Sequence, residues 1–258
     1  MKKNAIVNLQ GGLGNQIFQI AFALELKSQN IRTFCDVHFY DSNMQFPRQL
    51  ELDPLEFGFK SIKFKSNKIF SKLDTLFQEI DTFKFEDFKY LNRFIGYYQD
   101  FTIIEKQKVI LKELLKIQNM TYDSQKVLIH IRQDDYKKIN QDLTDSYYTK
   151  SIDEFLSINK NCEFDIFTDD VDFVPNIKIF RKIDKIYYPD ANIKPLEVFR
   201  NMSRYSNFIV ANSSFSALAA FLSNSKSKKV VYPEPWWRDS EIQIQNIPAS
   251  WIPVSNSK

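Results

Sequence analysis

Three short apolar runs in the second half of the chain each end abruptly in polar or charged residues. The runs cover 127–129, 164–167 and 208–210, and they lead into residues 130–136, 168–170 and 212–216. Apolar runs of this length, separated by segments with helical periodicity, are typical of βαβ units with a parallel sheet. Because ligands bind beyond the carboxyl ends of parallel strands, we expect the three polar segments to share one site.

The N-terminal residues predict a strand, a tight turn and a helix. Residues 5–9 are mostly apolar, and residues 15–29 carry an apolar residue at roughly every third or fourth position. The chain has only five glycines, and three of them lie between Gly11 and Gly14. Their clustering indicates either a turn that packing requires or a backbone that a substrate approaches closely. The spacing matches neither the dinucleotide-binding glycine motif nor the P-loop.

The remaining pattern extends the alternation of strands and helices. Further strands are predicted at 33–36 and 229–232, and helices at 103–117, 146–158, 196–204 and 215–222. A length of 258 residues suits one large α/β domain or two smaller domains that share a cleft. The mostly polar residues 118–125 predict a linker.

Composition excludes several classes of protein. A net charge of +3 is too balanced for a dedicated nucleic-acid-binding protein. Mean hydropathy is −0.37, and no apolar run is long enough to span a bilayer. The first apolar segment is interrupted too early for a signal peptide, and Cys35 and Cys162 fit no disulfide or metal framework, so we expect a cytoplasmic protein. Lysines and phenylalanines alternate over 57–90, which favours amphipathic elements; the alternative is peripheral contact with an anionic inner-membrane surface.

The polar strand ends contain groups suited to a phosphate. Arg132 offers a planar, permanently charged fork, although a solvated ion pair with Asp135 is an equally simple interpretation. Ser213 and Ser214 precede a predicted helix, where hydroxyls and backbone N–H groups hold a phosphate or simply cap the helix. The carboxylates in 168–170 fit a helix start, or acceptors for the N1 and N2 groups of guanine, and no third ligand for a metal is evident.

Five segments resemble, in order, the signatures of the bacterial α-1,2-fucosyltransferases of glycosyltransferase family 11. They are Gly11-Gly12-Leu13-Gly14-Asn15-Gln16-Ile17-Phe18-Gln19, Gly96-Tyr97-Tyr98-Gln99, His130-Ile131-Arg132 with Asp135-Tyr136, Phe167-Thr168-Asp169-Asp170, and Asn212-Ser213-Ser214-Phe215-Ser216. The resemblance implies an α/β, GT-B-like fold with two Rossmann-like lobes whose parallel sheets face a cleft. Residues 1–120 are then the acceptor-side lobe and residues 121–258 the GDP-sugar-binding lobe.

The family resemblance also implies a reaction. The chain is expected to move L-fucose from GDP-fucose, with inversion and without a metal or cofactor, to a galactoside hydroxyl in α-1,2 linkage. The acceptor is expected to be an oligosaccharide or a lipid-linked glycan in O-antigen or surface-glycan synthesis. Arg132 would stabilise the departing diphosphate, with Asp135 as the second catalytic residue.

The implied binding residues fall into two groups. The donor site comprises His130, Arg132, Asp169, Asp170, Ser213, Ser214, Phe215 and Ser216, and the cleft or acceptor side comprises Gly12, Gly14, Asn15 and Gln16. The general base is left open among Asp36, His38, Asp134 and Asp135.

The chain departs from the family pattern at three places. Gln133 replaces a second arginine, Asp134 replaces a frequent glycine, and Ala217-Leu218 replaces an aromatic pair. Two alternatives therefore accompany the leading hypothesis. One is a transferase that uses a different GDP-6-deoxysugar; the other, from a different class, is an inactive glycan-binding module.

Overall fold

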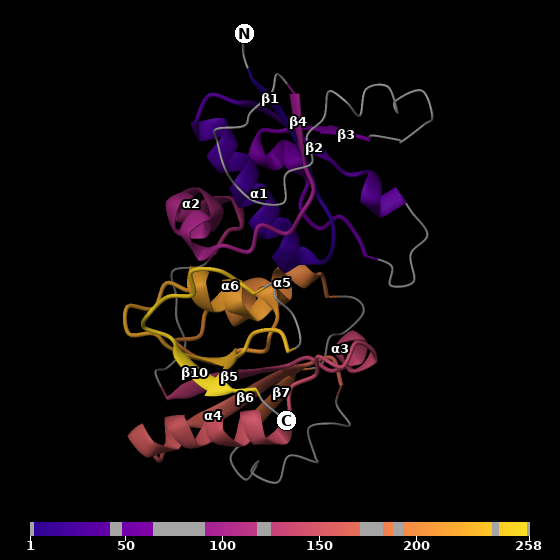
Figure 1. Ribbon diagram of the computed structural model, residues 1–258. Coiled ribbons are helices and arrows are strands. Elements are labelled where there is room, and N and C mark those ends of the chain that lie inside the picture. Colours follow the sequence, from indigo (N-terminus) through magenta and orange to yellow (C-terminus); the bar gives the residue numbers. More distant parts are fainter. Residues whose placement is uncertain are drawn as a thin grey trace. The chain divides into compact units, whose positions relative to one another are not determined.

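The computed structural model describes residues 3–41, 48–63, 91–117, 125–170, 183–187, 193–238 and 243–256 (Figure 1). The chain divides into two compact units, Met1–Leu114 and Leu115–Lys258. The predicted boundary between residues 120 and 121 lies among residues that the structure does not describe.

The first unit contains a four-stranded parallel sheet in the order β3-β2-β1-β4. Its elements are β1 (Asn4–Asn8), α1 (Leu13–Ser28), β2 (Arg32–Asp36), the 3-10 helices η1 (His38–Asp41) and η2 (Pro54–Phe57), β3 (Lys60–Ile62), β4 (Leu91–Phe94) and α2 (Phe101–Leu114). Strand β1 is buried on both faces, as the continuous apolar run of a central parallel strand requires. Phe22 of α1 anchors the core, stacking on Tyr98 at 4.1 Å between ring centroids.

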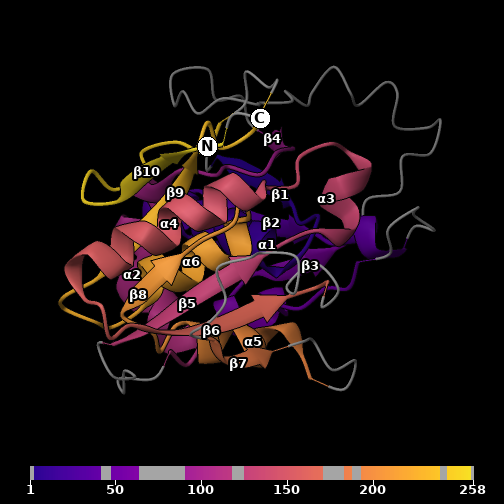
Figure 2. The ribbon, with the colours of Figure 1, turned by 90° about the horizontal axis from the view of Figure 1, so that it is seen from below.

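The second unit contains a six-stranded parallel sheet in the order β10-β9-β8-β5-β6-β7. Its elements are β5 (Lys126–Ile131), α3 (Asp134–Lys138), α4 (Asp145–Ile158), β6 (Glu163–Thr168), β7 (Ile183–Tyr187), α5 (Pro195–Met202), β8 (Asn207–Ile209), α6 (Ser214–Leu222), β9 (Lys229–Glu234) and β10 (Ile252–Ser255). Helix α4 covers one face of this sheet, and α5 and α6 cover the other (Figures 1 and 2). Tyr147 and Tyr148 of α4 are completely buried against the strands.

Both sheets change direction beside their first strand. In the second unit the chain passes from β5 through β6 to β7, and then returns to the opposite side of β5 as β8. This is the doubly wound order of a Rossmann-like sheet, and ligands bind where the order reverses. The pair of parallel α/β sheets confirms the predicted fold class, α/β and GT-B-like in its two Rossmann-like units.

Several predicted elements differ in detail. Helix α1 begins at Leu13 and not at residue 15, and a further strand, β10, follows β9 and pairs with it in parallel. Helix α5 begins at Pro195, whose fixed φ and missing N–H suit the first helical position. Most of the lysine- and phenylalanine-rich stretch, residues 64–90, lies outside the described residues. Among the helices that the structure describes, none is long and apolar enough to cross a membrane.

Candidate active site

The reversal point of the second sheet gathers the polar segments that follow β5, β6 and β8. Ile131 at the end of β5 pairs with Thr168 at the end of β6, and Ile129 pairs with Ile209 at the end of β8. In-register parallel strands therefore deliver the three predicted segments to one sheet edge. This edge carries most of the predicted donor-site residues.

Arg132 lies between two carboxylates at this edge. Its Nη2 atom is 2.7 Å from Oδ1 of Asp135, and its Nη1 atom is 3.0 Å from Oδ2 of Asp169. Burial opposes the charge of Arg132, but the carboxylates of Asp169 and Asp135 outweigh it and raise the pKa of the guanidinium. The guanidinium carbon also lies 5.5 Å from the ring centroid of Tyr136. The predicted ion pair with Asp135 exists, and it holds a permanent cation in one orientation.

The acidic residues around Arg132 make contacts within the protein. Asp169 accepts a hydrogen bond from the backbone N–H of Gln133 at 2.8 Å, and burial raises the pKa of Asp169 although Arg132 lowers it. Asp170 forms an ion pair with Lys137, and Asp134 forms one with Lys138. Asp169 therefore orients Arg132, whereas Asp170 lies in an outer ion pair.

His130 is a neutral, buried group at the end of β5. Its ring centroid lies 6.2 Å from that of Phe215, and its Nδ1 atom has no hydrogen-bond partner among the described residues. Burial, helped by the charge of Arg132, lowers the pKa of His130 to about 3. At neutral pH an uncharged imidazole therefore lies beside the permanent cation of Arg132.

The buried histidine predicts a specific loss of stability in acid. The folded-state pKa of about 3 is below the ordinary value of 6.5, so protonation of the unfolded chain favours unfolding as pH falls below 6.5. Unfolding free energies of wild type and His130→Gln at pH 8 and pH 5 test this. We expect the wild type to lose about 2 kcal/mol more than the variant between these pH values. Equal losses would show that His130 is not buried in its neutral form.

The start of helix α6 provides the second part of the site. Ser213 is the N-cap residue, but its side chain makes no capping hydrogen bond, so the simple capping interpretation is wrong for this hydroxyl. The amide of Asn212 donates to the backbone carbonyl of Gln141 at 2.8 Å, and the hydroxyl of Tyr136 donates to the carbonyl of Asn212 at 3.2 Å. Ser216 is buried and faces the carbonyl of Ser213. A helix N-terminus that is linked through Tyr136 to a half-buried arginine is a geometry suited to an anion.

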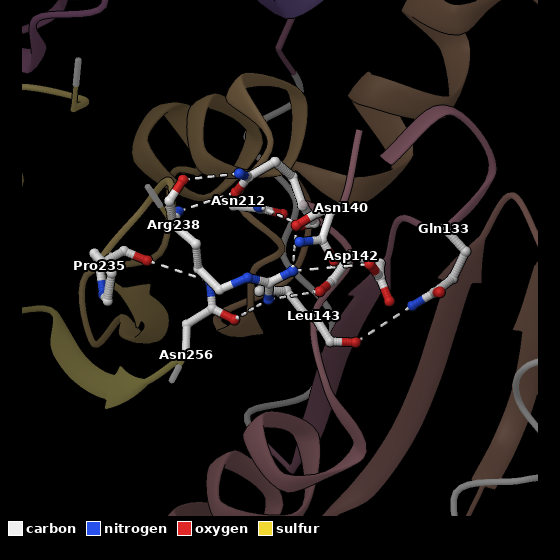
Figure 3. Close-up of polar contacts among 9 residues, drawn as sticks. Gln133, Asn140, Asp142, Leu143, Asn212, Pro235, Arg238 and Asn256 are labelled. Atoms are coloured by element: carbon white, nitrogen blue, oxygen red, sulfur yellow. Dashed lines mark hydrogen bonds and ion pairs between the residues drawn. The ribbon is translucent and has the colours of Figure 1, made fainter. Parts of the chain in front are cut away.

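Most of the residues at which the chain departs from the family pattern have buried side chains, whereas Asp134 is exposed. Gln133 is fully buried, and its amide faces the carbonyl of Leu143 at 3.5 Å (Figure 3). Ala217 and Leu218 of α6 are also fully buried. These three side chains fill the interior of the unit.

The glycines of the turn in the first unit differ in their surroundings. The sequence indicated either a turn that packing requires or a backbone that a substrate approaches closely. Gly11 has a φ of +79°, which strains a residue with a side chain, and a Cβ there would also lie 2.6 Å from Nδ2 of Asn15, so the turn itself requires this glycine. A Cβ on Gly12 would meet no atom within 4 Å, which leaves room for a ligand to approach the start of α1. Asn15 accepts a hydrogen bond from Gln99 at 2.8 Å, so the first two family-like segments touch. Gly14 is buried in the first turn of α1.

Gln16, predicted on the acceptor side, is completely buried. Its side-chain Oε1 atom accepts hydrogen bonds from the backbone N–H groups of Glu51 and Leu52. Its side-chain Nε2 atom donates to the backbone carbonyls of Gly11 and Gln49. The Gln16 side chain therefore connects the glycine turn to the distant loop that contains residues 49–52. Its side chain has no exposed surface for a substrate.

The candidate general bases are all engaged in pairs. Asp36, buried at the end of β2, forms an ion pair with Arg93 at 3.3 Å, and His38 lies 3.7 Å from Asp41. Asp134 and Asp135 have the lysine and arginine partners described above. The described residues contain no group of three or more histidine, cysteine, aspartate or glutamate side chains that would hold a metal ion.

The two Rossmann-like units, with a cation and a helix N-terminus at the reversal point of the second sheet, define a doubly wound α/β protein. The family model described as glycosyl transferase family 11 matches residues 55–254, and the chain belongs to that family. The predicted family is thereby confirmed, and four of the five family-like segments lie within the matched residues.

Relatives with assigned roles come from Escherichia coli. An alpha-1,2-colitosyltransferase is 26% identical over 96% of this chain and 98% of its own length. The O-antigen biosynthesis glycosyltransferase WbnK is 26% identical over 89% of this chain and 93% of its own length.

The chain is also similar to solved structures of glycosyltransferases. The fucosyltransferase NodZ from Bradyrhizobium has a TM-score of 0.42 and 13% identity, covering 86% of this chain and 94% of that one. The E. coli heptosyltransferase WaaC with ADP has a TM-score of 0.46 and 7% identity, covering 99% of this chain and 93% of that one.

Proposed function

We propose that this glycosyltransferase moves L-fucose from GDP-fucose to a galactoside hydroxyl in α-1,2 linkage, with inversion, in O-antigen or surface-glycan synthesis. The observation that carries the proposal is Arg132, which is held between Asp135 and Asp169 and is linked through Tyr136 to the residue before the N-cap of α6. Both features suit the diphosphate of a nucleotide sugar. The acceptor is an oligosaccharide or a lipid-linked glycan.

The arrangement of Arg132 suggests how the leaving group is stabilised. Breaking the sugar–phosphate bond adds negative charge to the diphosphate, and a guanidinium fixed in advance stabilises that charge without reorganisation. Two carboxylates fix Arg132, while a guanidinium has five N–H donors, so these ion pairs do not exhaust it. The backbone at Ser213, Ser214 and Phe215 would hold the phosphate oxygens at the start of α6. No step in this scheme requires a metal or a cofactor.

The other predicted donor residues take different parts in this proposal. His130 is neutral at physiological pH and would contact the nucleoside by hydrogen bonding, since its Nδ1 atom lacks a partner among the described residues. Asp169 orients Arg132, and Ser216 packs inside α6. Asp170 remains a proposed contact of the nucleoside. In the first unit, the open space at Gly12 supports a contact with the sugar or the acceptor.

A second donor sugar is the strongest competing proposal. The similar E. coli protein named an alpha-1,2-colitosyltransferase spans nearly the whole chain, so a GDP-linked colitosyl donor competes with GDP-fucose. The buried positions of Gln133, Ala217 and Leu218 give no preference between these sugars. The inactive glycan-binding alternative requires loss of the leaving-group site, and the retained Arg132 cluster argues against it.

The reaction itself tests the proposal. The purified chain is incubated with GDP-fucose, GDP-colitose or GDP-mannose and a panel of galactosides, and products are detected by mass spectrometry. We expect a fucosylated galactoside whose NMR spectrum shows an α-1,2 linkage, together with release of GDP. A product from GDP-colitose alone would replace the proposed donor. Acceptor binding with no GDP release from any donor would instead establish the inactive binding module.

A further inference from the structure

The segment that follows β9 contacts residues next to the proposed donor site. Its Arg238 was not singled out by any sequence motif, yet this residue is buried and links three separate parts of the unit (Figure 3). We propose that Arg238 is a positioning residue that fixes residues 140–143 and, through them, the diphosphate-binding start of α6. This proposal rests on the proposed function, because it assigns Arg238 a part in binding the GDP-sugar donor.

The guanidinium of Arg238 holds the loop after α3 directly. Its Nη1 atom donates to the carbonyl of Asp142 at 2.8 Å and to Oδ1 of Asn256 at 3.0 Å, and its Nη2 atom donates to the carbonyl of Asn140 at 2.6 Å. The carboxylate of Asp142 adds an ion pair at 3.7 Å. Only a rigid fork of several donors makes these contacts together, so lysine is not an equivalent replacement.

The same loop is tied to the start of α6. The backbone N–H of Arg238 donates to Oε1 of Gln141 at 2.9 Å, and the Gln141 amide donates back to the Arg238 carbonyl at 2.8 Å. The backbone carbonyl of Gln141 accepts the amide of Asn212 at 2.8 Å. Asn212 immediately precedes the N-cap Ser213. A displacement of the loop would therefore move the first turn of α6.

A second contact from this segment reaches the arginine of the site. The ring of Trp237 stacks on Tyr136, with centroids 5.4 Å apart and an interplanar angle of 29°. Tyr136 lies against the guanidinium of Arg132 and donates its hydroxyl to the carbonyl of Asn212. Both connections thus end at Asn212, the residue before the N-cap of α6.

This connectivity predicts a selective effect on phosphate recognition. Hydrogen bonds to phosphate depend on the placement of the donor atoms, and a displacement of about 1 Å by a distant change reduces activity about 100-fold. Arg238 contacts the loop and not the strand that carries His130, so recognition of the nucleoside should be retained. Loss of Arg238 should therefore weaken the binding of GDP far more than the binding of guanosine.

The test compares GDP and guanosine binding by calorimetry in wild type, Arg238→Lys and Gln141→Ala. Arg200→Lys is the matched control, because the Arg200 guanidinium also bonds a backbone carbonyl, that of Leu115, but not in the loop. We expect Arg238→Lys and Gln141→Ala each to lower the affinity for GDP about 10-fold, while the affinity for guanosine changes less than about twofold. Arg200→Lys should match the wild type for both ligands.

The outcomes separate this inference from the proposed function. A wild type that binds no GDP overturns both. A wild type that prefers GDP, with the same preference in Arg238→Lys and Gln141→Ala, overturns the role of Arg238 alone. A parallel loss of GDP and guanosine affinity also overturns it, because that result indicates general damage to the fold. If Arg238→Lys does not fold, Gln141→Ala decides, because it removes the reciprocal bonds and leaves the guanidinium in place.

Discussion

Replacing Arg132 with alanine is expected to lower kcat for sugar transfer by about 100- to 1,000-fold. The variant loses the cation that is held between Asp135 and Asp169, and with it the group that neutralises charge on the leaving diphosphate. Arg132→Lys should retain part of the activity, because it restores a charge but not a planar fork. Initial rates with saturating donor and acceptor measure both effects.

Lys138→Ala is the matched control for the loss of a cation. Lys138 is exposed and forms an ion pair with Asp134 on α3. This variant should keep its rate within about twofold of the wild type, since exposed ion pairs contribute little. Equal losses in both variants, or full activity in folded Arg132→Ala, would remove Arg132 from the proposed mechanism.

Gln16→Ala is expected to produce the largest loss of stability, about 3 kcal/mol of unfolding free energy. The side chain is fully buried and bonds four backbone groups, two N–H groups from Glu51 and Leu52 and two carbonyls from Gly11 and Gln49. Alanine removes these four hydrogen bonds, and the loss of a partner by a buried polar group is costly, although the carbonyl of Gly11 keeps its bond from the Tyr40 hydroxyl.

Urea unfolding followed by circular dichroism measures this loss. Gln29→Ala is the control, because Gln29 lies exposed just after the same helix and its side chain bonds only Glu25 in the hydrogen bonds described. It should change stability by less than about 0.5 kcal/mol. A Gln16 variant as stable as the Gln29 variant would contradict the role of Gln16 in connecting the turn and the loop. It would favour the prediction that Gln16 faces the acceptor.

The buried strands were predictable, and the edge strands were not. Strands β1, β5 and β6 lie inside their sheets and are mostly buried, so most of their residues are apolar. Strand β10 lies at an edge and contains Pro253, and the sequence of the opposite edge strand, β7, is Ile-Asp-Lys-Ile-Tyr. Proline and charge are tolerated at edges but obscure the pattern from which a strand is predicted.

The candidate site was predictable where its residues are close in sequence or follow parallel strands. Arg132 and Asp135 are three positions apart, and Asp169 joins them because β5 and β6 pair in register. The partners of Gln16 and Arg238 lie in distant loops, so no local pattern signals their roles. Conformation, not composition, likewise distinguishes Gly11 from Gly12.

The central claim is that the reversal point of the second sheet binds the diphosphate of a nucleotide-sugar donor through Arg132. Calorimetric titration of wild type and Arg132→Ala with GDP and with guanosine tests it most directly. We predict that the wild type binds GDP more tightly than guanosine, and that Arg132→Ala loses this preference while still binding guanosine. A wild type that binds GDP no more tightly than guanosine, or a preference that survives in Arg132→Ala, would contradict the claim.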